Sequence, residues 1–300
     1  MQTIPLGLYI HLPWCERKCP YCDFNSHEAR TIPETAYVDA LLRDLEIDRG
    51  LAGGRPVSTL FIGGGTPSLF SSPAIARLLA GIGSLVELSP SLEATMEANP
   101  GSAEAEKFAG FRAAGINRLS LGVQSFDDDL LQRIGRIHGR REIDRAIRSI
   151  QDAGIGNFNI DLMFALPGQS LEQAVEDVRL ALLCRPAHLS QYHLTIEPNT
   201  AFYASPPPLP AEELAWDMQE AGAELLGDAG FSGYEVSAWA VSGRECRHNL
   251  NYWEYGDYLG LGAGAHGKIT LPSDDAVRRR IRKRHPNAWM EAVSAGDSLA

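Results

Sequence analysis

The segment Cys15-Glu-Arg-Lys-Cys19-Pro-Tyr-Cys22 places three cysteines in a C-x3-C-x2-C spacing, directly after the apolar, strand-like run Gly7–Leu12. A cubic four-iron cluster that is held by three thiolates keeps one iron without a protein ligand. Such an iron can bind a small molecule, whereas ordinary electron-transfer clusters carry four cysteines. The spacing therefore favours an iron–sulfur site that supports chemistry over a simple electron relay.

A closed zinc site is the alternative interpretation of the same segment. Cys15, Cys19 and Cys22 together with His27 make a Cys3His set, which zinc accepts in tetrahedral geometry. Structural zinc usually staples a small domain with ligand pairs from separate segments, and here all four residues fall within thirteen positions of a long chain. The spacing alone favours iron–sulfur by only about two to one, so both interpretations stay open at this point.

Composition sets the outer limits of the fold and the compartment. Three hundred residues with 44% hydrophobic residues fit one large α/β domain, or such a domain with an appendage. The chain has no uncharged apolar run of about 18 residues or more, which predicts that nothing spans a membrane. The first ten residues lack a basic region and a cleavage-like site, and five cysteines, three of them clustered, suit a reducing compartment. We expect a cytoplasmic protein.

Charge argues against one class of partner. The formal net charge of −11 excludes general binding to nucleic acid, whose phosphates require a basic face. Positive charge is concentrated in the segment 277–285, which holds six arginines and lysines. A solvated face is the first interpretation of this run. The sharper alternative is a contact for propionates, for a partner protein or for acidic lipid headgroups, which would mean peripheral association with a membrane.

Short apolar runs alternate with longer amphipathic stretches over the first two hundred residues. The predicted strands are Gly7–Leu12, Val57–Ile62, Leu92–Glu97, Arg118–Val123, Asn157–Met163 and His188–Leu194. The predicted helices are Glu34–Asp48, Pro73–Leu85, Ala103–Ala114, Arg141–Ala153 and Leu171–Leu183. Several helix ends carry their expected signals, namely Ser72 as an N-cap before Pro73, a capping box at Ser170 and Gln173, and C-terminal glycines at 115 and 154.

Six successive strand–helix units predict parallel strands joined by right-handed crossovers. Sheets of this kind bind ligands where the strands end and the βα loops meet. The notable residues occupy these positions, and they are the cysteines, Gly63–Pro67, Glu97, Gln124 and Asp161. The pattern changes beyond about residue 200, where Pro206–Pro210 breaks the rhythm. We therefore predict an α/β partial (β/α)6 barrel over residues 1–200 and a C-terminal appendage over residues 201–300.

Five segments together resemble the radical S-adenosylmethionine superfamily. They are Tyr9-Ile-His-Leu-Pro followed by the three-cysteine motif, Gly63-Gly-Gly-Thr-Pro67, Glu97-Ala-Asn-Pro100, Gly122-Val-Gln-Ser-Phe126 and Asn159-Ile-Asp-Leu-Met163. Within that superfamily the chain resembles the branch of anaerobic coproporphyrinogen III oxidase and of the haem chaperone family. The likeness runs from about residue 5 to at least His266.

The resemblance implies a set of cofactors and residues. It implies that Cys15, Cys19 and Cys22 hold a 4Fe–4S cluster whose fourth iron is chelated by S-adenosylmethionine, and that a reduced cluster can cleave this cofactor to a 5′-deoxyadenosyl radical. It also implies a group of residues that contact S-adenosylmethionine, namely Tyr9, Tyr21, Gly64, Gly65, Thr66, Glu97, Gln124, Arg136 and Asp161.

Two departures bear on which branch member the chain is similar to. The oxidase motif has a further cysteine two places after the third, and this chain has Phe24 there. The oxidase also carries an N-terminal extension, whereas the cysteines here begin at residue 15. With these two departures, and with the segment His248-Asn-Leu-Asn-Tyr-Trp253, the chain resembles the chaperone branch. The resemblance implies haem binding and transfer of haem to respiratory acceptor proteins, with oxygen-independent coproporphyrinogen III oxidation as the alternative.

His248 is the candidate haem ligand, because neutral imidazole is a common axial ligand of haem iron and several aromatic residues follow it. The alternative is that His248 is hydrogen-bonded inside the protein while those aromatics pack against the barrel. His193, His266 and Cys246 are rival ligands, and Cys184, at the end of an apolar helix, is expected to belong to the core.

Overall fold

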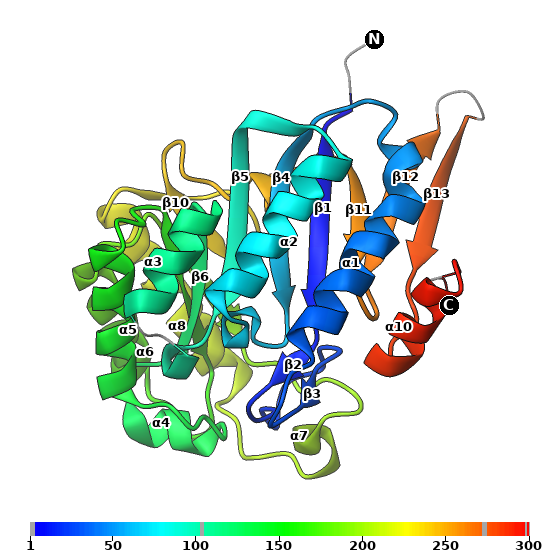
Figure 1. The fold of residues 1–300 in the computed structure, drawn as a ribbon. Coiled ribbons are helices and arrows are strands. Elements are labelled where there is room, and N and C mark those ends of the chain that lie inside the picture. The colour runs from blue at the N-terminus through cyan, green and yellow to red at the C-terminus, as the bar shows by residue number, and fades with distance from the viewer. Residues whose placement is uncertain (1–3, 103–104, 272–274, 298, 300) are drawn as a thin grey trace.

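The six predicted strands lie side by side in the centre of one sheet. A computed structural model describes residues 4–102, 105–271, 275–297 and 299 of the chain. Within its 11-stranded sheet six neighbouring strands run parallel in chain order (Figure 1). They are β1 (Leu6–Leu12), β4 (Val57–Gly64), β5 (Leu88–Ala98), β6 (Arg118–Gln124), β7 (Phe158–Phe164) and β8 (His188–His193). The predicted barrel of six strand–helix units is confirmed, with β5 beginning earlier than the sequence indicated.

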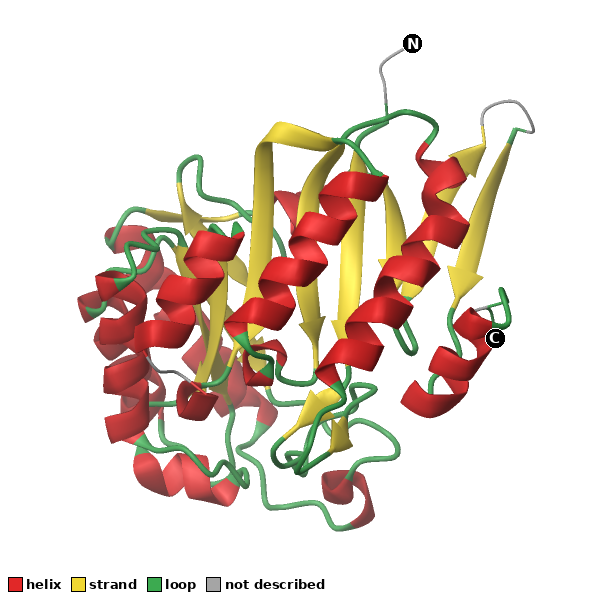
Figure 2. Cartoon of the chain, in the orientation of Figure 1, coloured by secondary structure: helices red, strands yellow, loops and turns green. Residues whose placement is uncertain are grey.

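Helices connect these strands and cover one face of the sheet (Figures 1 and 2). They are α1 (Glu34–Asp48), α2 (Ser72–Leu85), α3 (Ala105–Ala114), α4 (Asp128–Arg133), α5 (Arg140–Asp152) and α6 (Leu171–Leu183). The predicted start of the third helix, Ala103, lies outside the described residues. Residues 1–3, which belong to the N-terminal segment in which no export signal was expected, lie outside them as well. Six of the seven residues of β1 are buried, whereas β6, β7 and β8 carry polar residues at alternate positions.

The last hundred residues extend the same sheet at both edges. At one edge β11 (Asp257–Leu261) pairs in parallel with β1, and β12 (His266–Leu271) and β13 (Ala276–Ile281) follow as antiparallel strands. At the other edge β10 (Ala238–Val241) and β9 (Phe231–Gly233) continue beyond β8. The remaining elements are α7 (Ala201–Ala204), α8 (Glu212–Asp228), α9 (Arg247–Trp253), α10 (Pro286–Ser294) and the short pair β2 (Trp14–Cys15) and β3 (His27–Glu28). The domain division at residue 200 stays a prediction.

Most predicted helix ends are correct, and one is displaced. Helix α2 is capped by Ser71, whose hydroxyl accepts a hydrogen bond from the N–H of Ala74, so the prediction of Ser72 was wrong by one residue. The following Pro73 occupies the first turn, where its missing N–H costs nothing. The capping box of α6 is confirmed at Ser170 and Gln173. Gly115 has a φ of 115°, in the left-handed region expected after a helix.

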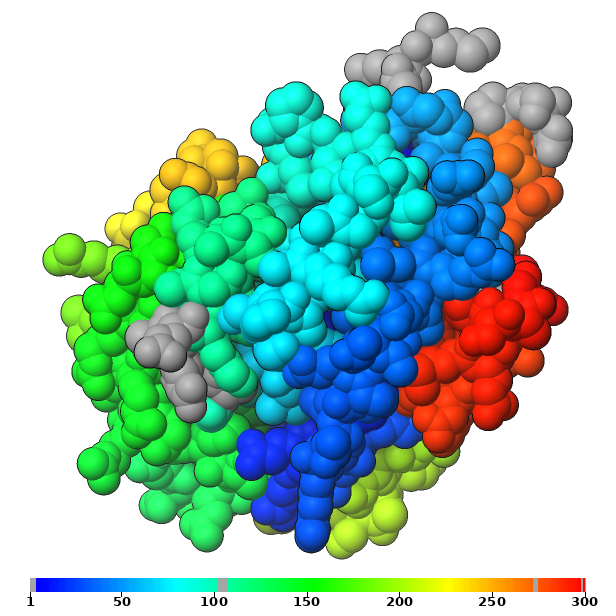
Figure 3. Space-filling model, viewed as in Figure 1, coloured from blue at the N-terminus to red at the C-terminus, as the bar shows by residue number. Residues whose placement is uncertain are grey.

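The C-terminal helix closes the sheet beside α1, and the space-filling view shows their residues in contact (Figure 3). Trp289 of α10 is fully buried against Tyr37 of α1, with ring centroids 4.8 Å apart. Arg282 reaches the same helix, where Nε donates to Asp44 at 3.0 Å and Nη2 donates to Asp48. The basic run is therefore not only a solvated face, because part of it forms buried ion pairs that attach β13 to α1.

No helix in the described ranges has the length and apolarity needed to cross a bilayer.

Candidate cofactor site

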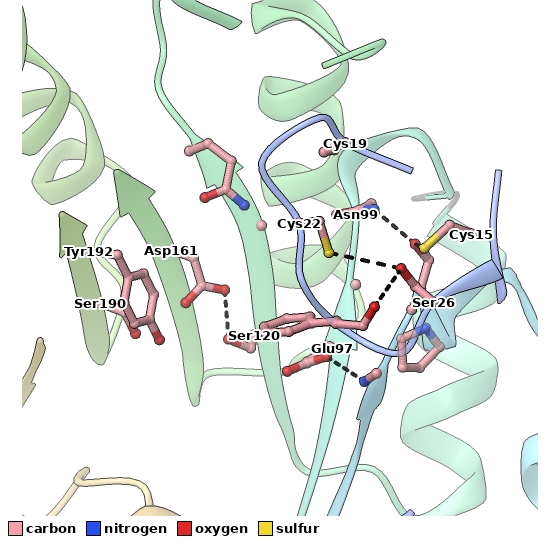
Figure 4. Close-up of a pocket in the computed structure, with 18 of the residues that line it drawn as sticks. Cys15, Cys19, Cys22, Ser26, Glu97, Asn99, Ser120, Asp161, Ser190 and Tyr192 are labelled. Atoms are coloured by element: carbon pink, nitrogen blue, oxygen red, sulfur yellow. Dashed lines mark hydrogen bonds between the residues drawn. The ribbon is translucent and has the colours of Figure 1, made fainter. Parts of the chain in front are cut away.

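The predicted site residues gather around one cavity of about 450 Å³ at the end of the parallel strands (Figure 4). All but one of the residues predicted to bind the cluster or its cofactor line it. They are Cys15, Cys19, Cys22, Tyr21, Gly64, Gly65, Thr66, Glu97, Gln124, Arg136 and Asp161. The exception is Tyr9, which lies on a neighbouring cavity.

The cysteine loop is held in place by the short strands that flank it. Trp14 and Cys15 of β2 pair with His27 and Glu28 of β3, so the loop leaves and returns at one point. Inside the loop the N–H of Cys22 donates to the carbonyl of Cys19 at 3.1 Å, which closes a turn. A turn at this position brings the second and third thiols to the same side of the loop as the cavity.

Each thiol of the motif has a polar neighbour. Thr66 Oγ1 donates to Cys15 Sγ at 3.7 Å, and Arg136 Nη1 donates to Cys19 Sγ at 3.8 Å. Cys22 Sγ lies 3.9 Å from the hydroxyl of Ser26. Burial raises the pKa of Cys15 and of Cys22 above the ordinary value. Burial disfavours the charged thiolate, so these cysteines lose their protons when a bound cation replaces the stabilisation that water would give. Cysteines that ligate metals behave in this way.

The other two cysteines do not line the cavity. Cys246 is buried at the start of α9, where its thiol donates to Glu93 at 3.8 Å, and Cys184 caps the end of α6. Cys184 packs against the core but is only half-buried, as the cap position dictates. Three thiols on one cavity fit a cluster with an iron that the protein leaves open.

The fourth ligand of the zinc alternative lies elsewhere. His27 belongs to a different pocket, where its ring lies 5.7 Å from that of His285. In the described part of the chain, no three His, Cys, Asp or Glu side chains are already grouped around the position of a single metal ion. The position of His27, away from the cavity that the three cysteines line, counts against a closed Cys3His zinc site.

The glycine loop, residues 63–67, follows β4 and runs against the cysteine loop. The N–H of Gly65 donates to Leu12 and the N–H of Thr66 donates to Trp14, at 2.8 and 2.7 Å. A Cβ at position 65 would lie 2.5 Å from the carbonyl oxygen of Trp14, so only glycine allows this approach. The same contacts place the Thr66 hydroxyl beside Cys15.

Two half-buried carboxylates lie deeper in the cavity. Glu97 at the end of β5 accepts a hydrogen bond from Gly64 N–H at 3.0 Å, and burial followed by the charge of Asp161 raises its pKa to about 7. Asp161 of β7 accepts hydrogen bonds from Ser120 at 2.9 Å and Asn159 at 2.7 Å, and burial raises its pKa too. Carboxylates of this kind are suited to accept from hydroxyl or ammonium groups of a ligand.

A cation and an unusual backbone conformation complete the cavity wall near the cysteines. Arg136 Nη2 donates to the carbonyl of Gly122 at 2.5 Å and to Asn99 at 3.1 Å. Gln124, at the end of β6, has a φ of 71°, in the left-handed region that non-glycine residues rarely adopt. Strain of this kind is found where a loop positions a functional group, and the Gln124 side chain borders the cavity.

The comparison with protein families decides the identity of this fold. The model of the radical SAM superfamily matches residues 9–181, more than half of the chain. The chain belongs to the radical SAM superfamily. Its fold and its three-cysteine cavity agree with that membership.

Named relatives place the radical SAM chain in one branch. It is 52% identical over 288 residues to the heme chaperone HemW of Escherichia coli, covering 96% of this chain and 76% of that protein. It is 50% identical over 291 residues to the heme chaperone HemW of Haemophilus influenzae, covering 95% and 76%. Coproporphyrinogen III oxidase (HemN) from Escherichia coli has a similar structure, with a TM-score of 0.85 and 25% identity over 99% of this chain and 71% of that one. The chain therefore lies in the HemN-like branch, among homologues named HemW.

The radical SAM family implies a 4Fe–4S cluster and S-adenosylmethionine, and the residues present fit both groups. The cavity offers three thiols without a fourth cysteine, a glycine loop that admits close backbone approach, and two half-buried carboxylates with unused acceptor capacity.

A second cavity of about 500 Å³ adjoins the first and shares Phe24, Gly64 and Glu97 with it. Tyr9 lines this second cavity, and its hydroxyl is hydrogen-bonded to Nδ1 of His11 at 2.9 Å. The remaining wall includes two tyrosines whose rings meet edge to face, an exposed histidine and an arginine. These residues are Tyr252, Tyr258, His266 and Arg284.

His248, the predicted haem ligand, faces the sheet. It is 1% exposed, its Nδ1 is bonded to Thr59 at 2.9 Å and its Nε2 to the hydroxyl of Tyr252 at 2.9 Å. Burial, followed by the charge of Arg118, lowers its pKa to about 3, so the imidazole is neutral. Neutral imidazole can ligate iron, but here both nitrogens are engaged, as the packing alternative predicts. Haem ligation by His248 stays a prediction that requires the ring to leave these partners.

The sequence reasoning missed several polar residues that line the main cavity below the cysteines. They occupy alternate positions of three strands and a turn of α9, and they are Arg118, Ser120, Asn159, His188, Ser190, Tyr192 and Asn249. The signal was present as a period of two, with polar residues at 118 and 120, 159 and 161, and 188 and 190. Because a barrel strand has its inner face toward the interior, these alternations mark a polar cavity in place of an apolar core.

Proposed function

We propose that this chain is a haem chaperone that holds a 4Fe–4S cluster and S-adenosylmethionine and passes haem to respiratory acceptor proteins. The observation that carries the proposal is 52% identity, over 96% of the chain, to a protein named heme chaperone HemW. We propose that it acts in the cytoplasm and that exposed arginines of β13, such as Arg278 and Arg279, serve peripheral contact with a membrane.

In this proposal Cys15, Cys19 and Cys22 are the cluster ligands. Thr66 and Arg136 support them, because each donates a hydrogen bond to a ligand sulfur and so stabilises its negative charge.

S-adenosylmethionine is proposed to lie between the cluster and the carboxylates. Gly64, Gly65 and Thr66 would present backbone groups to its amino-acid part, and Glu97 and Asp161 would accept from its ammonium or ribose hydroxyl groups. Tyr21, Gln124 and Arg136 would close the wall around it, and Tyr9 would act from the second cavity. The bound cofactor supplies radical chemistry, while the protein orients it and excludes water.

Haem is proposed to bind at the second cavity, because its tyrosines offer flat faces for a porphyrin and Arg284 offers a partner for a propionate. His248 reaches this cavity only through Tyr252, whereas His266 lines it directly and is exposed. The two histidines are therefore separable candidates for the iron ligand.

Haem titration of the anaerobically purified protein tests the proposal. We expect a Soret band on adding haem that is diminished in His248→Ala, with His266→Ala as the matched variant. A spectrum unchanged in His248→Ala but diminished in His266→Ala transfers the ligand role to His266. Absence of a Soret band in the wild-type protein contradicts the chaperone function.

Oxygen-independent coproporphyrinogen III oxidation is the second candidate, favoured by the TM-score of 0.85 to a coproporphyrinogen III oxidase. Phe24, which borders both cavities, occupies the position of the additional cysteine in the oxidase motif. An anaerobic assay with reductant, S-adenosylmethionine and coproporphyrinogen separates the two functions. Protoporphyrinogen formed with many turnovers per chain would establish the oxidase and refute the chaperone.

A further inference from the structure

Asn99, directly after β5, lines the main cavity beside the cysteine loop (Figure 4). Its side-chain amide is bonded to two residues that each donate a hydrogen bond to a cysteine of the motif. Oδ1 accepts from Arg136 Nη2 at 3.1 Å, and Nδ2 donates to Thr66 Oγ1 at 3.0 Å. One amide thus links the hydroxyl that donates to Cys15 with the guanidinium that donates to Cys19.

The direction of each hydrogen bond follows from the chemistry of the groups. A guanidinium only donates, so the amide oxygen of Asn99 faces Arg136 and its NH2 group faces Thr66. The Thr66 oxygen therefore accepts from Asn99, and its own proton is directed to Cys15 Sγ, 3.7 Å away. A chain of hydrogen bonds with one fixed direction runs from the guanidinium through the amide and the hydroxyl to the sulfur.

The surroundings of Asn99 hold this amide in place. Its backbone N–H donates to Ser68 Oγ at 3.3 Å, and Arg136 Nη2 donates to the carbonyl of Gly122 as well as to the amide oxygen. A Cβ at position 122 would lie 3.0 Å from Asn99 Oδ1, which is closer than an ordinary contact. The glycine therefore leaves the room that the amide needs beside β6.

We propose that Asn99 is a positioning residue that raises the reduction potential of the cluster, because it directs two hydrogen-bond donors at the sulfur ligands. Hydrogen bonds to these sulfurs stabilise the electron-rich, reduced cluster and so favour its reduction. An amide suits this position, since it is a neutral group that accepts from Arg136 and donates to Thr66 at once. The inference rests on the proposed function, because it requires the 4Fe–4S cluster on the three cysteines of the motif.

Asn99→Asp tests the direction of the chain with almost no change of shape. A carboxylate only accepts, so the Thr66 hydroxyl would turn to the new carboxylate and Cys15 would lose its donor. The midpoint potential of the cluster is measured anaerobically by electron paramagnetic resonance, in the wild-type and in the Thr66→Val background. We expect Asn99→Asp to lower the potential in both backgrounds, because it adds negative charge, and to lower it further where the hydroxyl is present. This excess should change the ratio of reduced to oxidised cluster at a fixed applied potential by roughly threefold or more.

Two further variants complete the design. Asn99→Leu adds no charge and removes the partner that orients Thr66, so it should also lower the potential more where the hydroxyl is present, and it decides the question if Asn99→Asp retains too little iron. Asn117→Asp is the matched control, because this amide likewise accepts at Oδ1 and donates at Nδ2, but to the backbone of Ala94 and Leu92. It should leave the potential unchanged.

The outcomes separate this inference from the proposed function. An equal shift in both Thr66 backgrounds, or no shift in either, overturns the role of Asn99. Iron and sulfide content and the response to S-adenosylmethionine are measured on the same samples. A wild-type protein without the cluster refutes the cluster-binding part of the proposed function and this inference with it, whereas a wild-type cluster whose potential the variants leave unchanged refutes the inference alone.

Discussion

The carboxylate of Glu97 accepts a hydrogen bond from the backbone N–H of Gly64 at 3.0 Å, which ties the end of β5 to the glycine loop of β4. Glu97 also lies between the two cavities, since it borders both. One side chain thus positions the loop beside the cysteines and keeps acceptor capacity for a ligand. Its ionisation has a measurable cost, because burial and Asp161 raise its pKa to about 7.

The first prediction concerns the pH dependence of stability. An unfolded glutamate loses its proton near its ordinary pKa of 4.5, whereas the folded chain retains this proton up to about pH 7. The stability contributed by protonated Glu97 is therefore present below pH 4.5 and is lost as the pH rises to about 7. Glu97→Gln keeps an acceptor for Gly64 and removes the cost of the charge. At pH 8, without added ligand, the variant should be more stable than wild type by roughly 1–3 kcal/mol.

Urea unfolding at pH 5 and at pH 8 checks this expectation, with the cluster-bearing protein kept anaerobic. At pH 5 the gain in stability should fall to roughly a quarter of its value at pH 8. An equal gain in unfolding free energy at both pH values would show that the gain does not come from the ionisation of Glu97.

The second prediction concerns the close approach of the glycine loop. In Gly65→Ala the new methyl group would lie 2.5 Å from the carbonyl oxygen of Trp14, so the loop must move away from Cys15. We expect this variant to retain less iron and sulfide per chain after anaerobic purification. Gly83→Ala, in helix α2, is the matched control. A Cβ at position 83 would meet only the side chain of Leu88, at an ordinary contact distance of 3.5 Å. Full iron content in Gly65→Ala would mean that the approach is not needed for the site.

The third prediction concerns the buried ion pairs of β13. Arg282→Met removes the cation that is paired with both Asp44 and Asp48, while Arg280 stays paired with Asp48, and breaking a buried pair in this way costs about 3–5 kcal/mol. Denaturant unfolding should show this loss, while Arg278→Met, on the exposed strand β13 that precedes Arg282, should change stability by less than about 0.5 kcal/mol. Equal stability of the two variants would contradict a structural role for the buried part of the basic run.

Most of the fold could be predicted from the sequence because strand and helix signals agree with each other. The apolar run of β1 and the capping box at Ser170 are local features, and both fix their elements without reference to distant residues. The parallel order of the strands then follows from the helices between them. The addition of β11 beside β1 could not be predicted, because this pairing joins residues about 250 positions apart.

The site was predictable where residues follow strand ends and unpredictable where burial depends on tertiary packing. Glu97 was found because it nearly ends β5, whereas Asp161, which was expected near a strand end, lies in the middle of β7. Arg118 was missed because the alternation of polar and apolar residues in β6 was not interpreted as the lining of a cavity. The orientation of His248 depends on its contact with Thr59, 189 residues away, and no local pattern fixes such a contact.

The most direct test of the account is electron paramagnetic resonance of the reduced, anaerobically purified protein with and without S-adenosylmethionine. The account predicts four irons and four sulfides per chain and a cluster signal that shifts when S-adenosylmethionine is added, because the cofactor binds the iron that the three cysteines leave open. A protein with one zinc and no iron would contradict the account, and so would a cluster signal that does not change when S-adenosylmethionine is added.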